Sequence, residues 1–486
     1  MKWSRRLAAI TLAIGVTGGL TSGFSPAEDK GVNPKIQEMM GQVSEVRIKA
    51  ILEKMESFGT RNTMSNADDP VHGVGAARTW ILNEMTGYSP KLQVRFEKFR
   101  VKKQGQRIFK DVDLYNVVAI LPGKKMPETV VVVSAHYDSL NLGTRPAAAP
   151  AGPGTETAGG AVGAGAPGNT TANMTLADFE KNAELPAPGV CDDASGTAAV
   201  MELARVMSQY EFDKTVAFIV FAGEEQGLIG SSLQAVKAKK ENQAIEAVLN
   251  NDIIGTDVAG NGRMGNGSVS VYSDETMDSV SQQLSRYVRE IGERYLPSMK
   301  INTVFMGDRL GRGGDHTPFQ WEGFAAVRVS TPNEIYANQH RATDTLANMS
   351  VPYTAKVAKV NLVAAASLAL GPKPPIVLPE PRAGGGGGRR PMPMIARGGG
   401  YDAVLRWRAA GVEDDIKGYA IVMRATTSPY WEQEIYVGKV TTYTLKDVSI
   451  DDAKFGVKAI GNNGVESLVT SYAYPPRQKV EIETVQ

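Results

Sequence analysis

Apolar residues in the first part of this chain follow two patterns, one typical of strands and the other typical of helices. Short unbroken runs rich in Val, Ile and Ala indicate strands that are buried on both faces of a sheet. Such runs occupy residues 116–123, 129–138, 215–225, 247–255 and 324–331. Apolar residues at helical spacing occupy residues 34–57, 74–85, 194–210 and 276–296. Because strands and helices alternate, we expect an α/β domain with a largely parallel central sheet and helices on both of its faces.

The pattern changes after residue 400. Short runs of alternating apolar and polar residues follow one another through residues 401–478, and this pattern predicts a small all-β sandwich. Trp407 in an early strand, the segment "GYAIVMR" and the hairpin "FGVKAIGNNGVES" resemble a fibronectin type III module. The resemblance implies a role in binding or spacing, with a polymer or a surface ligand as the kind of partner that such a module could bind.

Two segments of biased composition mark the organisation of the chain. Residues 141–190 are rich in Gly, Ala and Pro, which predicts a low-complexity loop inserted into the α/β domain. Residues 371–400 are first Pro-rich and then Gly-rich, as is typical of a linker. We therefore expect the α/β domain in residues 28–370, followed by the linker, the sandwich and a short tail in residues 479–486.

Residues 1–27 have the pattern of a signal peptide. Basic residues precede an apolar stretch, and small residues then lead to Ala27. An uncleaved membrane anchor is the alternative, but it needs about 20 unbroken apolar residues, and glycines and threonines interrupt this stretch. We expect a protein that is secreted or located in the periplasm or cell envelope, with no transmembrane helix after cleavage of the signal peptide.

The composition excludes some partners and some sources of stability. The 53 Lys and Arg residues balance the 52 Asp and Glu residues, so nothing favours a nucleic-acid partner. The only cysteine is Cys191, so no disulfide can form within the chain. Stability therefore has to come from a sizeable core or from bound metal.

Histidine and acidic residues lie near the ends of predicted strands, just before a predicted helix, or in a loop late in the α/β domain. They are His136, Asp138, Asp192, Asp193, Glu224, Glu225, Asp252 and His340. Any one of these acids could be a helix cap or a solvated turn residue. Together, however, they would form a cluster of repelling negative charge unless a cation neutralised it. Imidazole and carboxylate ligands without a thiolate are typical of a catalytic zinc site.

The adjacent Glu224 and Glu225 raise a further question, because a buried strand rarely ends in two repelling carboxylates. One of the two glutamates can bind metal while its neighbour transfers a proton. Cys191, beside Asp192, is an alternative soft ligand, although a small buried residue is the preferred interpretation at this position.

Five ordered motifs resemble a known family. The segments "HYDS", "CDDASG", "GEEQGLIGS", "NND" and "HRATDT" occur in the order and approximate spacing of the co-catalytic two-zinc exopeptidases of clan MH. The resemblance covers about residues 45–370 and includes "FGTRN" and "GDHTPFQWEGF". This family includes bacterial secreted zinc aminopeptidases, with glutamate carboxypeptidase and glutaminyl cyclase as relatives.

The resemblance implies a zinc-exopeptidase fold that binds two zinc ions per chain. His136 and Asp252 would bind one ion, Glu225 and His340 the other, and Asp192 would bridge the two.

The resemblance also implies catalytic roles for Glu224 and Asp138. Glu224 would act as the general base while a water held between the metal ions attacks the scissile carbonyl. Asp138 would orient the imidazole of His136, as the partners of metal-bound histidines usually do.

These expectations favour an aminopeptidase that acts on peptide or protein substrates. Three alternatives remain at this point: a glutaminyl-peptide cyclase, a carboxypeptidase or dipeptidase on the same fold, and a non-enzymatic ectodomain. The ectodomain is disfavoured because every ligand position implied by the resemblance is present in this chain.

Overall fold

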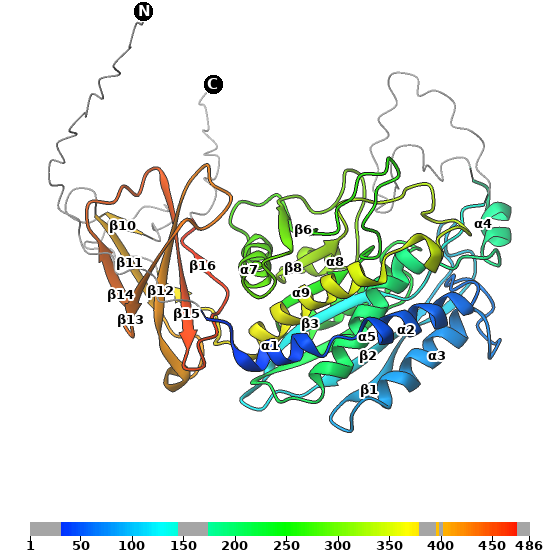
Figure 1. The fold of residues 1–486 in the computed structure, drawn as a ribbon, viewed down its shortest axis with the longest axis horizontal. Coiled ribbons are helices and arrows are strands. Elements are labelled where there is room, and N and C mark those ends of the chain that lie inside the picture. Colours follow the sequence, from blue (N-terminus) through cyan, green and yellow to red (C-terminus); the bar gives the residue numbers. More distant parts are fainter. Residues whose placement is uncertain (1–30, 144–173, 379–394, 398–401, 474–486) are drawn as a thin grey trace, which may run out of the picture.

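The computed structural model describes residues 31–143, 174–378, 395–397 and 402–473, which form an α/β domain and a β-sandwich side by side (Figure 1). The predicted signal peptide, the tail in residues 479–486 and most of the Gly/Ala-rich insertion lie outside the described residues. In the part of the chain that is described, no helix is both long and apolar enough to cross a membrane.

The α/β domain is built on an eight-stranded sheet. Along the sheet, the strands follow the order β1 (Gln93–Val101), β2 (Val112–Leu121), β4 (Lys214–Phe221), β3 (Met126–His136), β5 (Ala244–Asn251), β8 (Ala326–Ser330), β6 (Ser268–Tyr272) and β7 (Lys300–Val304). The central pairs β4–β3, β3–β5 and β5–β8 are parallel. Because parallel strands run in one direction, their carboxyl ends lie at the same edge of the sheet.

The sheet is covered on both faces because its strands are apolar on both faces. In β3, for example, Val131 and Val133 belong to the larger hydrophobic core, whereas Val132 belongs to a smaller core on the other side. The larger core contains side chains of α5 (Ser195–Met207), α7 (Val280–Tyr295) and α9 (Val351–Leu370). The smaller core contains side chains of α6 (Ile229–Lys240) and α8 (His316–Trp321). The predicted α/β architecture is therefore observed.

One predicted helix is divided in two. Residues 34–57 form α1 (Pro34–Gly41) and α2 (Glu45–Ser57) instead of a single helix. The break follows Gly41, a poor helix former, and the hydroxyl of Ser44 accepts a hydrogen bond from the amide of Arg47 at the start of α2. The next predicted helix, residues 74–85, is observed as α3 (Gly73–Thr86).

The C-terminal part is a sandwich of two antiparallel sheets. One sheet contains β9 (Ile376–Val377), β10 (Ala396–Arg397), β11 (Ala403–Arg408) and β14 (Thr442–Leu445). The other contains β13 (Gln433–Gly438), β12 (Ile416–Ala425), β15 (Ala453–Gly461) and β16 (Thr470–Ser471). Trp407, Phe455 and Val457 are buried in the core between them. The described residues of the predicted linker thus include two short strands of the sandwich.

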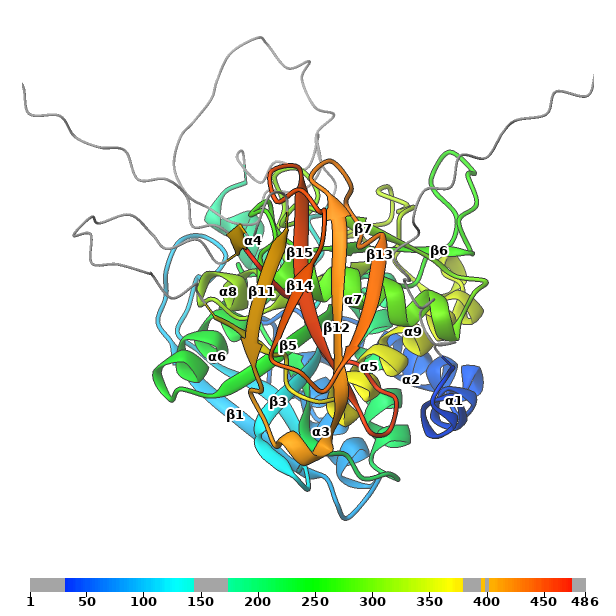
Figure 2. The ribbon, with the colours of Figure 1, turned by 90° about the vertical axis from the view of Figure 1, so that its left-hand side faces the viewer.

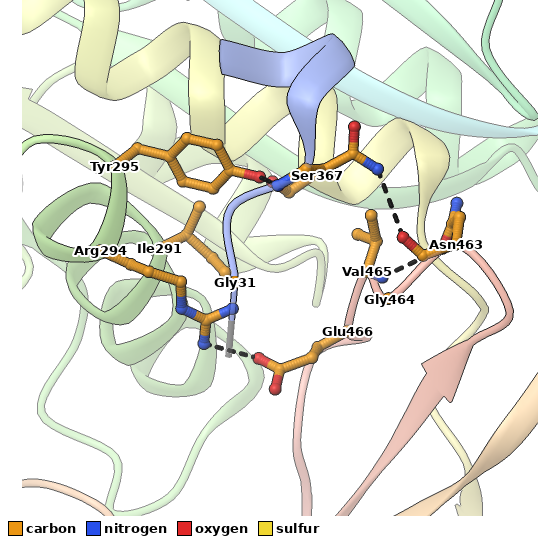
Figure 3. Close-up of a pocket in the computed structure, with 10 residues that line it drawn as sticks. Gly31, Ile291, Arg294, Tyr295, Ser367, Asn463, Gly464, Val465 and Glu466 are labelled. Carbon is orange, nitrogen blue, oxygen red and sulfur yellow. Dashed lines mark hydrogen bonds and ion pairs between the residues drawn. The ribbon is translucent and has the colours of Figure 1, made fainter. Parts of the chain in front are cut away.

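The sandwich is packed against α7. In Figure 2 the sandwich faces the viewer and α7 lies behind it. Lys458 of β15 is 2% exposed, and its ammonium group lies 2.7–3.2 Å from the carboxylates of Glu290, Glu434 and Glu466. Arg294 of α7 also pairs with Glu466, at 3.0 Å, beside the pocket shown in Figure 3. The carboxylates at this junction therefore converge on cations from both parts of the chain.

Apolar contacts reinforce this junction. Val465 and Leu468, from the hairpin after β15, belong to the larger core of the α/β domain. The indole of Trp431 donates a hydrogen bond to Gln283 of α7 at 3.2 Å. Arg424 of β12 forms a buried ion pair with Asp278 at 2.7 Å. The sandwich is thus an integral part of the folded chain.

We expect Lys458→Met to destabilise the protein by about 3–5 kcal/mol, because three carboxylates would then surround an apolar side chain. Urea unfolding measures the difference. Lys446→Met is the matched control: its exposed ammonium pairs with Asp402, and exposed pairs contribute little. Equal stability of the two variants would contradict a stabilising role for the buried lysine.

Candidate metal centre

The predicted site residues meet at the carboxyl edge of the sheet. His136 is the last residue of β3, Asp252 follows β5 directly, and Glu224 and Glu225 follow β4 in a short turn. Asp192 lies in the turn Val190–Ala194, immediately before α5. His340 lies in the loop between β8 and α9. Because β4, β3 and β5 are neighbours in the sheet, their ends bring four of these residues together.

Side chains of these residues form two groups in which potential ligand atoms all lie within 4.8 Å of one another. The first group contains His136, Glu224 and Asp252, and the second contains Asp192, Glu225 and His340. The predicted metal-binding residues and the predicted general base are therefore all present in one small volume.

Asp192 lies between the two groups. Its Oδ1 is 3.3 Å from Nε2 of His136, and its Oδ2 is 3.3 Å from Nε2 of His340. In the second group, Oε1 of Glu225 is 3.2 Å from the same nitrogen of His340. In the first, Oδ1 of Asp252 is 3.9 Å from Nε2 of His136. Each carboxylate oxygen of Asp192 thus faces a different histidine, as expected for a bridging ligand.

Asp138 contacts residues from both ligand groups without belonging to either group. It is fully buried, and Nδ1 of His136 lies 3.2 Å from its carbonyl oxygen and 3.5 Å from its Oδ1. Its carboxylate also accepts hydrogen bonds from the amides of Glu224 and Glu225, at 3.2 Å each, and from the hydroxyl of Thr63. The residue therefore positions the histidine and, in addition, the turn that carries both glutamates.

Asp193 binds backbone amides and is not one of the potential metal ligands. The peptide bond that joins it to Asp192 is cis. Its carboxylate accepts hydrogen bonds from the amides of Gly196 (2.9 Å), Ile253 (3.2 Å) and His136 (3.3 Å). The side chain therefore ties together the first turn of α5 and the ends of β3 and β5, and it is in neither ligand group.

The electrostatics of the centre favour a cation. Burial disfavours the charged imidazolium of His136, yet the carboxylates around it, Glu224 first among them, raise its pKa well above the ordinary value. Burial also opposes the charge on His340, but Glu225 and Asp192 raise the pKa of this histidine to about 9. The pKa of Glu224 is raised well above the ordinary value, chiefly by burial. Negative charge is in excess, and a proton or a metal ion has to balance it.

The donor atoms fit zinc. Nε2 of His136 and Oε1 of Glu225 are buried and have no hydrogen-bond partner among the described residues, so both are available to a metal ion. All the donors are imidazole nitrogens and carboxylate oxygens, which suit a catalytic zinc site. Cys191 is buried but belongs to neither group. Burial raises the pKa of its thiol well above the ordinary value.

Sequence reasoning missed three residues beside the centre. Arg328 of β8 is fully buried and donates hydrogen bonds to Asp252 (2.9 Å) and Asp308 (2.7 Å), which lowers the pKa of Asp252 although burial opposes this. Asp315 is a buried carboxyl whose pKa burial raises to about 7. The carboxylate of Asp344 accepts hydrogen bonds from the backbone amides of Cys191 and Asp192. Each left a signal in the sequence: Arg328 is a cation within an otherwise apolar strand, and Asp315 and Asp344 lie within the motifs "GDHTPFQWEGF" and "HRATDT", although the motifs did not show what these two residues contact.

Comparisons with known proteins agree with this geometry. The model of peptidase family M28 matches residues 116–365. A probable zinc metalloprotease from Pyricularia oryzae is 35% identical over 470 residues, covering 90% of this chain and 84% of that protein. Another probable zinc metalloprotease, from Leptosphaeria maculans, is 31% identical, covering 91% of this chain and 97% of that protein.

Solved structures with similar folds were also found. The LapA aminopeptidase of Legionella pneumophila has a TM-score of 0.48 and 17% identity, covering 72% of this chain and 78% of that one. A glutaminyl cyclase from Macrostomum lignano has a TM-score of 0.49 and 13% identity, covering 71% and 95% of the two chains. From the family match and the relatives identical at 30% or more, the chain belongs to peptidase family M28 and is a zinc metalloprotease.

Proposed function

We propose that this metalloprotease is a two-zinc aminopeptidase that removes N-terminal residues from peptides. The observation that carries the proposal is the position of Asp192, whose two oxygens each lie 3.3 Å from a different histidine. His136 and Asp252 would bind one zinc ion, Glu225 and His340 the other, and Asp192 both. When bound, the ions would supply Lewis acidity and lower the pKa of a water molecule at the site.

Glu224 is suited to act as the general base. Its amide is held by Asp138, so its backbone is fixed while its half-buried side chain reaches the first ligand group. Burial raises the pKa of Glu224 towards neutral pH. A general base accepts and returns a proton most effectively when its pKa lies near the pH of the reaction. Glu224 would take a proton from water and deliver it to the leaving amine.

The carboxyl groups of the site support recognition of a free N-terminus. Besides the proposed ligands, the carboxyl groups of Glu224 and the buried Asp315 lie at the same edge of the sheet. A carboxyl group that is not bound to metal can accept hydrogen bonds from the ammonium group of a substrate's N-terminus, whereas it offers no such partner to a C-terminal carboxylate. This argument favours an aminopeptidase over a carboxypeptidase.

Export and a fibronectin type III-like role for the sandwich complete the proposal. Export is supported only by the residue pattern of the signal peptide, which lies outside the described residues. The two antiparallel sheets and the buried Trp407 support the fibronectin-like assignment, with peptides or proteins as substrates and a polymer or surface ligand as a partner of the sandwich.

We expect Glu224→Gln to lower kcat by about 10²–10⁴-fold while both zinc ions stay bound, because the amide cannot accept the proton. Hydrolysis of a panel of amino-acid p-nitroanilides, together with zinc analysis of the purified protein, measures both quantities. Glu225→Gln is the comparison, and we expect it to lose zinc as well as activity. If Glu224→Gln hydrolysed the substrates at the normal rate, the general base would have to be another residue.

N-terminal specificity is tested by blocking the amine. We expect free amino-acid p-nitroanilides to be hydrolysed and their N-acetyl derivatives to be resistant, because acetylation removes the positive charge. Release of C-terminal residues from N-acetylated peptides would instead indicate a carboxypeptidase. Cyclisation of peptides with an N-terminal Gln, without hydrolysis, would indicate a glutaminyl cyclase.

Zinc should also stabilise the fold. At a free zinc concentration 100 times the Kd, each ion contributes about 2.7 kcal/mol to the free energy of unfolding. Thermal unfolding of chelator-treated protein, with and without added zinc, should therefore show a large upward shift of the midpoint. In Asp192→Ala, which lacks the shared carboxylate, the shift should be much smaller. An equal shift in this variant would argue against a bridging role.

A further inference from the structure

Asp344 connects two segments of the proposed zinc site that are far apart in the sequence. It follows His340 by four residues and is 4% exposed. Its Oδ1 accepts a hydrogen bond from the amide of Cys191 at 2.9 Å, and its Oδ2 accepts one from the amide of Asp192 at 3.0 Å. Its backbone carbonyl accepts a third bond, from the amide of Val190, at 3.0 Å. One residue thus binds three consecutive amides of the turn that carries the shared carboxylate.

The two residues just before this turn are held by Arg61. This buried guanidinium donates hydrogen bonds to the carbonyl oxygens of Pro188 and Gly189. The backbone has no spare room here, since a Cβ atom on Gly189 would lie 2.6 Å from the carbonyl oxygen of Asp192. Gly189 also has a φ of +48°, which glycine tolerates best. Amides of the turn and carbonyls of the two residues before it are therefore fixed by two residues of opposite charge, Asp344 and Arg61.

The position of this turn decides where the oxygens of Asp192 point. Each oxygen has to face a different histidine, so a small rotation of the backbone would separate one of them from its partner. Asp344 belongs to the same loop as His340, so the bonds that hold Asp192 also hold the loop of the histidine that it faces. Asp344 itself is in neither ligand group, so it acts through other residues.

We propose that Asp344 is a positioning residue for zinc: it joins the loop of His340 to the turn of Asp192 and thereby assembles the group of Asp192, Glu225 and His340. The proposal rests on the two-zinc function proposed above. Partners that orient metal ligands without touching the metal typically change metal affinity by about 10–100-fold. The first group, with His136 and Asp252 at the ends of β3 and β5, is less dependent on this connection.

The test compares the full-length wild-type protein with Asp344→Asn and Asp344→Ala. We expect the affinity for one of the two zinc ions, measured by competition with a chelator, to fall by about 100-fold in the alanine variant. The asparagine variant keeps one acceptor oxygen, so its loss should be about tenfold. The kcat of both variants should recover at high free zinc with little change in KM. At a free zinc concentration at which Asp344→Ala has lost one ion, adding His340→Ala should remove no further zinc, because both substitutions empty the same position.

Asp402→Asn is the matched control. Asp402 is also a buried carboxylate that accepts a backbone amide, from Asp447 at 3.1 Å, but it lies in the sandwich. This variant should bind zinc normally.

Three results would overturn the proposal. Wild-type zinc affinity in both Asp344 variants would show that Asp344 does not position a ligand. Unfolding of both variants in the zinc-free state, while Asp402→Asn stays folded, would show a purely structural role. Binding of fewer than two zinc ions by the wild-type protein would refute the proposed function itself, and this result is distinct because it does not depend on the variants.

Discussion

The structure depends on the burial of several carboxylates around two histidines at one edge of the sheet. Removing such charges from water is costly unless each has a partner. The protein meets part of this cost with its own groups, since Arg328 pairs with Asp252 and backbone amides bind Asp138 and Asp193. The remaining negative charge accounts for the raised pKa values of the two histidines, and in a zinc metalloprotease the metal is its natural counterion.

The sheet makes this concentration of charge possible. Strands β4, β3 and β5 are parallel neighbours, so the residues that follow them start from adjacent points without any long loop. The strands themselves are apolar on both faces and are buried under helices, which gives the site a rigid base. Asp192 and His340 are the exceptions, because they come from a turn and a loop. Their placement needs additional contacts, which Arg61 and Asp344 supply.

The sandwich is bound to this framework through α7. Its hairpin contributes Val465 and Leu468 to the main core, and Lys458 joins carboxylates from both parts of the chain. A freely tethered module would expose such residues to water. The interface therefore keeps the sandwich at a fixed position relative to the α/β domain.

The sequence alone indicated the α/β class, the main buried strands and the residues that meet at the centre, because apolar runs and the acids that end them are local features. The motifs around His136, Asp192 and Glu225 pointed to zinc for the same reason. The order of the strands in the sheet was observed only in the folded chain. The sequence did not reveal the break between α1 and α2, the docking of the sandwich, or the parts played by Arg328, Asp315 and Asp344. These features depend on contacts between residues that are distant in sequence, such as Asp344 and Asp192, and only the folded chain brings them together.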